Sequence, residues 1–131
     1  MAEDARGARK AAFFAAALAD RKGQIALDGV DALVKVMASG LCHTDIDVLH
    51  ARYGSGAFPL VPGHEYAGEV QMVAKDVTGI RAGDRVAVDP NLPCGTCPSC
   101  RKGLTNLCRD LKAYGVSHNG GFAEYSCVRA D

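Results

Sequence analysis

Four cysteines close together in the sequence constrain this chain more than any other feature. They follow the spacing Cys-x2-Cys-x2-Cys-x7-Cys, at Cys94, Cys97, Cys100 and Cys108. Thiolates three residues apart can converge on one ion, and four of them complete a tetrahedral zinc shell. Proline and glycine residues around the cysteines indicate a turning loop, which can wrap around an ion where a straight strand cannot. The pattern therefore predicts a structural zinc site.

Disulfides, an iron–sulfur cluster and unrelated buried thiols compete with zinc at these cysteines. Disulfides would need an oxidising compartment, and the chain otherwise has little in common with a small secreted fold. An iron–sulfur cluster fits the first three spacings, but the bacterial ferredoxin pattern has three residues before its last cysteine and a proline after it. Here seven residues precede Cys108, and Arg109 follows it. Four unrelated buried thiols within so short a span would be a coincidence, so zinc is the preferred interpretation.

Size and charge narrow the class of protein. A chain of 131 residues is large enough for one domain with a hydrophobic core. The 15 Lys and Arg residues balance 15 Asp and Glu residues, and Trp is absent. These features disfavour nucleic acid as a partner. No apolar run reaches the roughly 18 residues of a membrane helix, which disfavours a membrane partner. Reduced thiols that hold a metal suit the cytoplasm, where we expect the protein.

The first 22 residues are ambiguous. Basic residues precede the alanine-rich stretch 11–19, which ends in a motif resembling a signal-peptide cleavage site. Glu3 and Asp4 argue against a signal peptide, because such a segment is basic at its start. Residues 1–22 are therefore interpreted as a tail or as a first strand or helix, and residues 23–131 as the folded domain.

Short apolar segments separated by glycine and proline predict a mainly β domain, barrel-like or sandwich-like, with a few short helices. A loop is expected over residues 51–63, where prolines and glycines are frequent. A short helix is expected over residues 44–49. The expected strands are residues 24–27, 31–38, 69–74, 85–89 and 122–128.

Cys42, His64 and Glu65 form a second group of metal-ligand types. A catalytic zinc needs three protein ligands and one open position for water or substrate. Cys42 and His64 supply two of them, and Glu65 could bind directly or from outside the first shell. Asp45 is a carboxylate that could hold a histidine ring in one tautomer. The alternative is that Cys42 is a buried thiol and His64 an unrelated loop histidine.

Three motifs in a fixed order resemble those of the zinc-dependent alcohol dehydrogenases, the medium-chain dehydrogenase/reductase family. Residues 63–68 (GHEYAG), followed by Ala74 and Val77, resemble the zinc signature of that family, and residues 39–45 (SGLCHTD) its catalytic-zinc loop. The four cysteines resemble its structural zinc loop. The stretches VDPNLPCGTC and AYGVSHNGGFAEY are most similar to the polyol branch, the sorbitol and arabinitol dehydrogenases. The resemblance implies that residues 23–131 form a GroES-like catalytic domain, a partly open β-barrel with a zinc lobe.

The resemblance also implies roles for individual residues. Cys42 and His64 would hold the catalytic zinc, with Glu65 as a ligand or alternate ligand. Thr44 would relay a proton, His43 would face the cofactor pyrophosphate, and Asp45 would buttress His64. The structural zinc would be held by Cys94, Cys97, Cys100 and Cys108.

Four residues outside these roles can also be interpreted from the sequence. Asp47 stands where many relatives have a histidine that continues the proton relay. Cys127 fits no motif and is interpreted as a core thiol. His50 and His118 are expected at the surface or in packing contacts.

The implied chemistry is oxidation of a secondary alcohol or polyol by NAD or NADP, with zinc as a Lewis acid. No G-x-G-x-x-G motif for a dinucleotide occurs in the sequence. We therefore expect the catalytic portion of a longer enzyme, inactive by itself. The expected partner is a small alcohol or polyol, and a homo-oligomer is compatible with the family. The alternative is a non-catalytic zinc-binding fragment that serves as a structural or interaction module.

Overall fold

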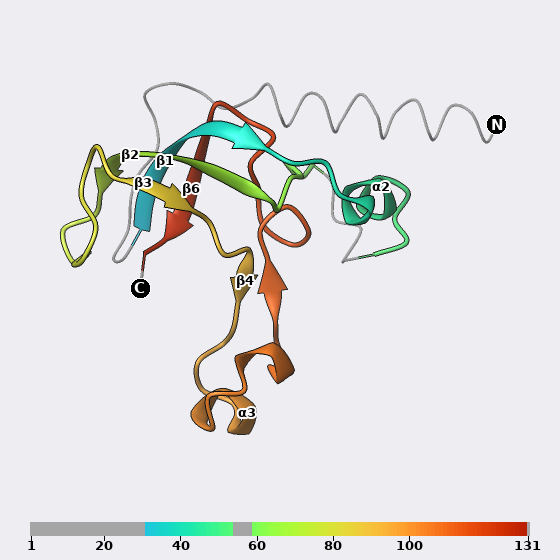
Figure 1. Cartoon of the computed structure of the whole chain (residues 1–131). Helices are drawn as coiled ribbons and strands as arrows, with labels where there is room; N and C mark the ends of the chain where they lie inside the picture. Colours follow the sequence, from blue (N-terminus) through green and yellow to red (C-terminus); the bar gives the residue numbers. More distant parts are fainter. Residues whose placement is uncertain (1–30, 54–58, 131) are drawn as a thin grey trace.

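Strands outweigh helices in the part of the chain that the computed structural model describes, residues 31–53 and 59–130 (Figure 1). The mainly β prediction is therefore confirmed. The helices are short: α2 (His43–Leu49), α3 (Pro98–Arg101) and the 3-10 helix η1 (Thr105–Leu107). The strands are β1 (Asp31–Ser39), β2 (Tyr66–Val73), β3 (Arg85–Ala87), β4 (Asn91–Leu92), β5 (Lys112–Ala113) and β6 (Tyr125–Arg129).

Four of these strands form one antiparallel sheet in the order β3-β2-β1-β6. Val34 in β1 pairs with Val70 of β2 on one side and with Ser126 of β6 on the other. The register between β1 and β2 shifts at two places, which bends these long strands. Within residues 31–53 and 59–130 the sheet runs from β3 to β6 without closing on itself.

The core lies on one face of this sheet. Alternate residues of the strands point inward, so the buried cluster is drawn from several strands and one loop. It consists of Ala32, Val34, Tyr66, Val70, Tyr114 and Val128. The Tyr66 hydroxyl and Ser126 Oγ lie 2.9 Å apart and hydrogen-bond within the core. At Gly68 a side chain is excluded, because a Cβ would lie 2.1 Å from the carbonyl oxygen of Lys35 in β1.

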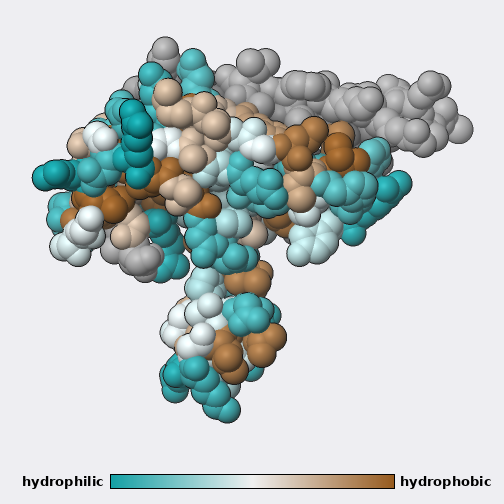
Figure 2. All heavy atoms as spheres, in the orientation of Figure 1, coloured by the Kyte–Doolittle hydropathy of each residue, from teal (hydrophilic) through white to brown (hydrophobic). Residues whose placement is uncertain are grey.

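Strands β4 and β5 form a separate two-stranded ribbon that leads away from the sheet. Between them, residues 93–111 form the cysteine lobe, which projects from the body of the molecule (Figure 1). Apolar side chains reach the surface of the lobe (Figure 2), where Leu104, Leu107 and Leu111 are exposed. In the described residues, the lobe follows directly on this ribbon, and neither α3 nor η1 packs extensively against the four-stranded sheet.

The sequence located most elements and misjudged some of their ends. Strand β2 begins at Tyr66 rather than Glu69, because small residues at 67 and 68 hide its alternation. Strand β6 begins at Tyr125, after a loop that the prediction counted as strand. The short elements β4, β5, α3 and η1 were not predicted. The strand expected over residues 24–27, and the tail 1–22, lie outside the described residues.

Cys127 corrects a prediction. It was interpreted as a core thiol, but its side chain is exposed. Its neighbours Ser126 and Val128 are the buried residues of β6, so the alternation of a strand directs Cys127 outward. His50 and His118 are exposed, as expected. In the described part of the chain, no helix has the length and apolarity needed to cross a membrane.

Candidate metal centres

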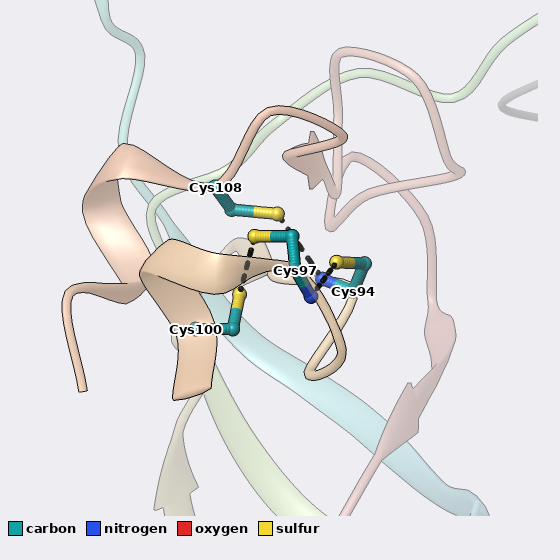
Figure 3. A group of neighbouring side chains, drawn as sticks. All are labelled: Cys94, Cys97, Cys100 and Cys108. Atoms are coloured by element: carbon teal, nitrogen blue, oxygen red, sulfur yellow. Dashed lines mark hydrogen bonds between the residues drawn. The ribbon is translucent and has the colours of Figure 1, made fainter. Parts of the chain in front are cut away.

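The four cysteines of the lobe bring their sulfurs together at one point (Figure 3). All four Sγ atoms lie within 4.8 Å of one another. Cys94 follows β4, Cys97 and Cys100 lie at the start and within the single turn of α3, and Cys108 follows η1. Pro98 fits the first position of α3, where no backbone N–H is needed for a helical bond. Four convergent thiols are the donor set of a structural zinc site, so these residues fit the ion.

The sulfurs differ in the hydrogen bonds they receive from backbone N–H groups, and the pKa values of their thiols differ too. The N–H groups of Thr96 and Cys97 lower the pKa of the Cys94 thiol to about 6. The backbone N–H of Cys100 is the main group that lowers the pKa of Cys97. Burial, and then the neighbouring sulfurs of Cys97 and Cys108, raise the pKa of Cys100 to about 12. A divalent cation would favour the thiolate form of all four, because its positive charge stabilises the sulfurs that bind it.

Cys42, His64 and Glu65 form the second cluster, and it is built differently. Cys42 stands before the first turn of α2, while His64 and Glu65 stand just before β2. Their ligand atoms lie within 4.8 Å of one another. His64 Nε2 is 3.8 Å from Glu65 Oε1, and the side-chain exposures are 14% and 56%. One side of this cluster is therefore open to solvent.

The buried side of the cluster is organised by Asp45, which is 2% exposed. Its Oδ2 accepts a 2.9 Å hydrogen bond from the N–H of Cys42, and its Oδ1 accepts a 3.1 Å bond from the N–H of Gly63. The same carboxylate therefore ties the loop of Cys42 to the loop of His64. Sequence reasoning placed Asp45 beside His64 but did not anticipate these two backbone bonds.

One ring nitrogen of His64 is buried without a hydrogen-bond partner. Its Nδ1 lies 3.3 Å from Asp45 Oδ1, yet it is buried without a hydrogen bond of good geometry. A histidine that binds a metal through Nε2 carries its proton on Nδ1, which here faces the carboxylate. A thiol, an imidazole and a carboxylate in this arrangement fit a zinc site with an open position.

Helix α2 carries further polar side chains between this cluster and the solvent-exposed surface. Thr44 Oγ1 lies 3.7 Å from Cys42 Sγ. His43 is 81% exposed, and its Nε2 lies 3.8 Å from Asp47 Oδ1. Arg52 Nη1 approaches the same carboxylate oxygen to 3.7 Å, a contact that the sequence did not suggest. Asp47 thus faces two basic groups.

Residues 28–131 match the alcohol dehydrogenase GroES-like domain. The chain belongs to this family. The resemblance drawn from the three motifs is thereby confirmed, together with the GroES-like fold. The sheet, the short helices and the cysteine lobe described above all fall within this one GroES-like domain.

Individual relatives agree with this assignment. D-altritol 5-dehydrogenase from Agrobacterium fabrum (strain C58 / ATCC 33970) is 83% identical over 100 residues, which cover 76% of this chain and 30% of that protein. Galactitol-1-phosphate dehydrogenase from Escherichia coli superposes with a TM-score of 0.77 at 34% identity, over 85% of this chain and 32% of that chain. A cobalt- and zinc-bound thermostable alcohol dehydrogenase from Pyrobaculum aerophilum gives 0.75 at 32% identity, over 82% and 33%. The chain spans about a third of the length of these relatives.

This GroES-like domain also contains site contacts that no motif revealed. Residues 115–122 lie against residues 61–63, which lead into His64. The sequence signal was only a cluster of glycines, Gly115, Gly120 and Gly121, which is equally typical of a surface turn. Their role depends on a partner segment far away in the chain, so local patterns could not show it.

Proposed function

We propose that this chain is the catalytic-domain portion of a zinc-dependent oxidoreductase that oxidises a secondary alcohol or polyol with NAD or NADP. The observation that carries the proposal is the convergence of Cys42, His64 and Glu65 around a point that is open on one side. Family membership supports it, as do two relatives whose names specify D-altritol and galactitol-1-phosphate. Both names point to substrates of the polyol class.

In this proposal Cys42, His64 and Glu65 hold the catalytic zinc, and Asp45 keeps His64 in the required orientation. A zinc ion bound there supplies Lewis-acid chemistry to a substrate oxygen. Thr44 stands beside Cys42, and its hydroxyl can accept a proton from the substrate alcohol while donating its own to the next acceptor. The hydride acceptor is a nicotinamide, whose chemistry belongs to the cofactor.

The cysteine lobe has a different role in the same proposal. Four thiolates would fill the whole coordination shell of a zinc ion, so no position is left for substrate. Cys94, Cys97, Cys100 and Cys108 therefore hold a structural ion. The open cluster around Cys42 is the place for the reaction.

His43 is proposed to face the pyrophosphate of the dinucleotide. It is exposed at the start of α2, and Arg52 adds a second basic group nearby through Asp47. Because the chain spans about 30% of D-altritol 5-dehydrogenase, we propose that turnover requires the remainder of a complete enzyme. A dinucleotide-binding domain belongs to that remainder.

The test is the reduction of NAD and of NADP by the complete enzyme, followed as nicotinamide absorbance, with D-altritol, galactitol and simple secondary alcohols as substrates. We expect oxidation of at least one polyol and its loss to background in Cys42→Ser. Cys127→Ser is the matched control, because it makes the same change on an exposed position of β6.

Two results would contradict the proposal. One is a complete enzyme that oxidises no alcohol or polyol while binding two zinc ions per chain, which would instead support a non-catalytic zinc module. The other is full turnover by Cys42→Ser.

A further inference from the structure

Residues 115–122 run alongside residues 61–63, the segment that leads into His64. Three consecutive N–H groups of the first segment bind three carbonyls of the second. Gly120 donates to Val61 at 2.7 Å, Gly121 to Gly63 at 2.8 Å, and Phe122 to Pro62 at 2.9 Å. We propose that residues 115–122 are a clamp that positions His64 for metal binding, and that Asn119 and Gly120 are its positioning residues. The inference rests on the proposed metal site at Cys42, His64 and Glu65.

The two segments approach so closely that side chains are excluded between them. A Cβ on Gly120 would lie 2.0 Å from the carbonyl oxygen of Gly63, and one on Gly115 would lie 2.7 Å from the same atom. A Cβ on Gly121 would lie 2.3 Å from the Tyr66 ring. Contacts below 3.0 Å with backbone atoms cannot be relieved by moving a flexible side chain, so the clamp depends on glycine.

Asn119 adds a side-chain bond to the same segment. Its Oδ1 accepts a 3.0 Å hydrogen bond from the N–H of Val61, although the two residues are 58 positions apart in the sequence. Val61 is buried, so its N–H has little access to water if that acceptor is removed. A buried donor without an acceptor is costly, and the segment would shift to relieve it.

Gly63 is held from two directions. Its N–H donates to Asp45 on the side of α2, and its carbonyl oxygen accepts from Gly121 of the clamp. Its φ of +88° is a conformation that glycine adopts readily, and a Cβ there would lie 2.5 Å from the Phe122 ring. Because both the N–H and the carbonyl oxygen of Gly63 are hydrogen-bonded, the backbone leading into His64 is held in place. His64 then has little freedom beyond rotation of its own side chain. Such support is what keeps a metal ligand in register with its partners.

The experiment measures Co²⁺ binding to the chain after its cysteine lobe has been loaded with zinc. Co²⁺ bound to the Cys42 thiolate gives a charge-transfer absorption, and its visible bands report the coordination geometry. A difference spectrum against Cys42→Ser isolates this site. We expect Asn119→Ala to weaken Co²⁺ binding by about tenfold, the lower end for residues that support metal ligands. Its visible spectrum should also change.

Two substitutions serve as controls. Asn119→Asp retains an oxygen acceptor for the Val61 N–H and should restore both affinity and spectrum. Ser117→Ala removes bonds that stay within the same loop, to Ala113 and His118, and it should bind Co²⁺ as the wild type does. A merely structural role for Asn119 would lower the melting temperature of Asn119→Ala while leaving the spectrum of bound Co²⁺ unchanged.

Gly120→Ala is the stronger variant, and we expect it to lose Co²⁺ at this site while keeping one zinc in the lobe. Gly79→Ala is its control for backbone strain without a clash, since its φ is +91° and nothing lies within 4 Å of a Cβ there. If Gly120→Ala does not fold, the Asn119 series decides. Wild-type affinity and spectrum in Asn119→Ala would overturn the clamp and leave the metal site standing. A wild-type chain that takes up one metal ion only would overturn both.

Discussion

The cysteine lobe and the Cys42 cluster both bring metal-ligand side chains together, but they depend on the fold in different ways. The lobe takes all its ligands from one stretch of 15 residues, and its own backbone N–H groups bond its sulfurs. The Cys42 cluster takes its ligands from two separate segments, which Asp45 and the clamp of residues 115–122 hold together. A metal can therefore organise the lobe locally, whereas the second cluster requires the sheet to be formed first.

The largest effect is expected from Cys97→Ser in the lobe. A structural zinc ion contributes on the order of 10 kcal/mol to folding in small zinc domains, and one weak ligand would lose much of it. We expect the loss of one zinc equivalent and a melting temperature lower by about 10 °C or more. Metal analysis and thermal unfolding measure the two effects. Cys127→Ser should change neither, and unchanged zinc content in Cys97→Ser would refute the lobe as a zinc site.

Asp45→Ala should affect the second cluster and spare the lobe. The change leaves the N–H groups of Cys42 and Gly63 without acceptors, at about 1–3 kcal/mol for each group that is buried. Co²⁺ affinity at the second cluster should fall about 10–100-fold. Asp84→Ala is the matched control, since Asp84 accepts a backbone bond in an exposed turn. Loss of the lobe zinc in Asp45→Ala would show that the two regions are not independent.

The thiols of the metal-free lobe should differ in reactivity. The lowered pKa of Cys94, about 6, makes it mostly thiolate at pH 7, whereas the raised pKa of Cys100, about 12, keeps that thiol protonated. Because the thiolate is the nucleophile, iodoacetamide should modify Cys94 at least roughly tenfold faster. The rate at Cys94 itself should fall as the pH drops through about 6, because its thiolate becomes protonated. Peptide mass mapping after brief labelling measures it, and equal labelling would contradict the local N–H effect.

Tyr66→Phe should have the smallest effect. It removes the bond to the Ser126 hydroxyl within the core and should lower the free energy of unfolding by about 1–2 kcal/mol. Both metal sites should keep their affinity, because neither uses this bond. Urea unfolding and metal titration test this. The double variant Tyr66→Phe/Ser126→Ala should cost less than the sum of the two single changes. Additive losses would mean that the two hydroxyls do not interact.

The sequence predicted the parts of the molecule that depend on local patterns. The spacing of the four cysteines indicated the lobe, and the alternation in β1 and the residues of α2 indicated their elements with small errors at the ends. Cys42, His64 and Glu65 were grouped from residue type and family motif, and the structure brings their ligand atoms together. Local spacing sufficed for the lobe, whereas the second group depended on the family resemblance.

Features that depend on distant contacts were missed. Cys127 was assigned to the core because thiols are often buried, but the position of β6 on the sheet directs it outward. The bonds from residues 119–122 to residues 61–63 connect segments whose sequences give no sign of pairing. Arg52 and Asp47 meet because α2 ends in a turn, which the sequence alone did not place.

The geometry of the β4–β5 ribbon would allow the lobe to be gained or lost during evolution. Leu92 and Lys112 face each other at its end, so the chain enters and leaves the lobe at neighbouring points. A segment with adjacent ends can be gained or lost without altering the path of the chain elsewhere, much as a hairpin tolerates insertions at its tip. A two-residue turn in place of residues 93–111 could join Leu92 to Lys112 and keep them paired. The lobe is therefore a removable module, and its zinc would leave with it as a unit.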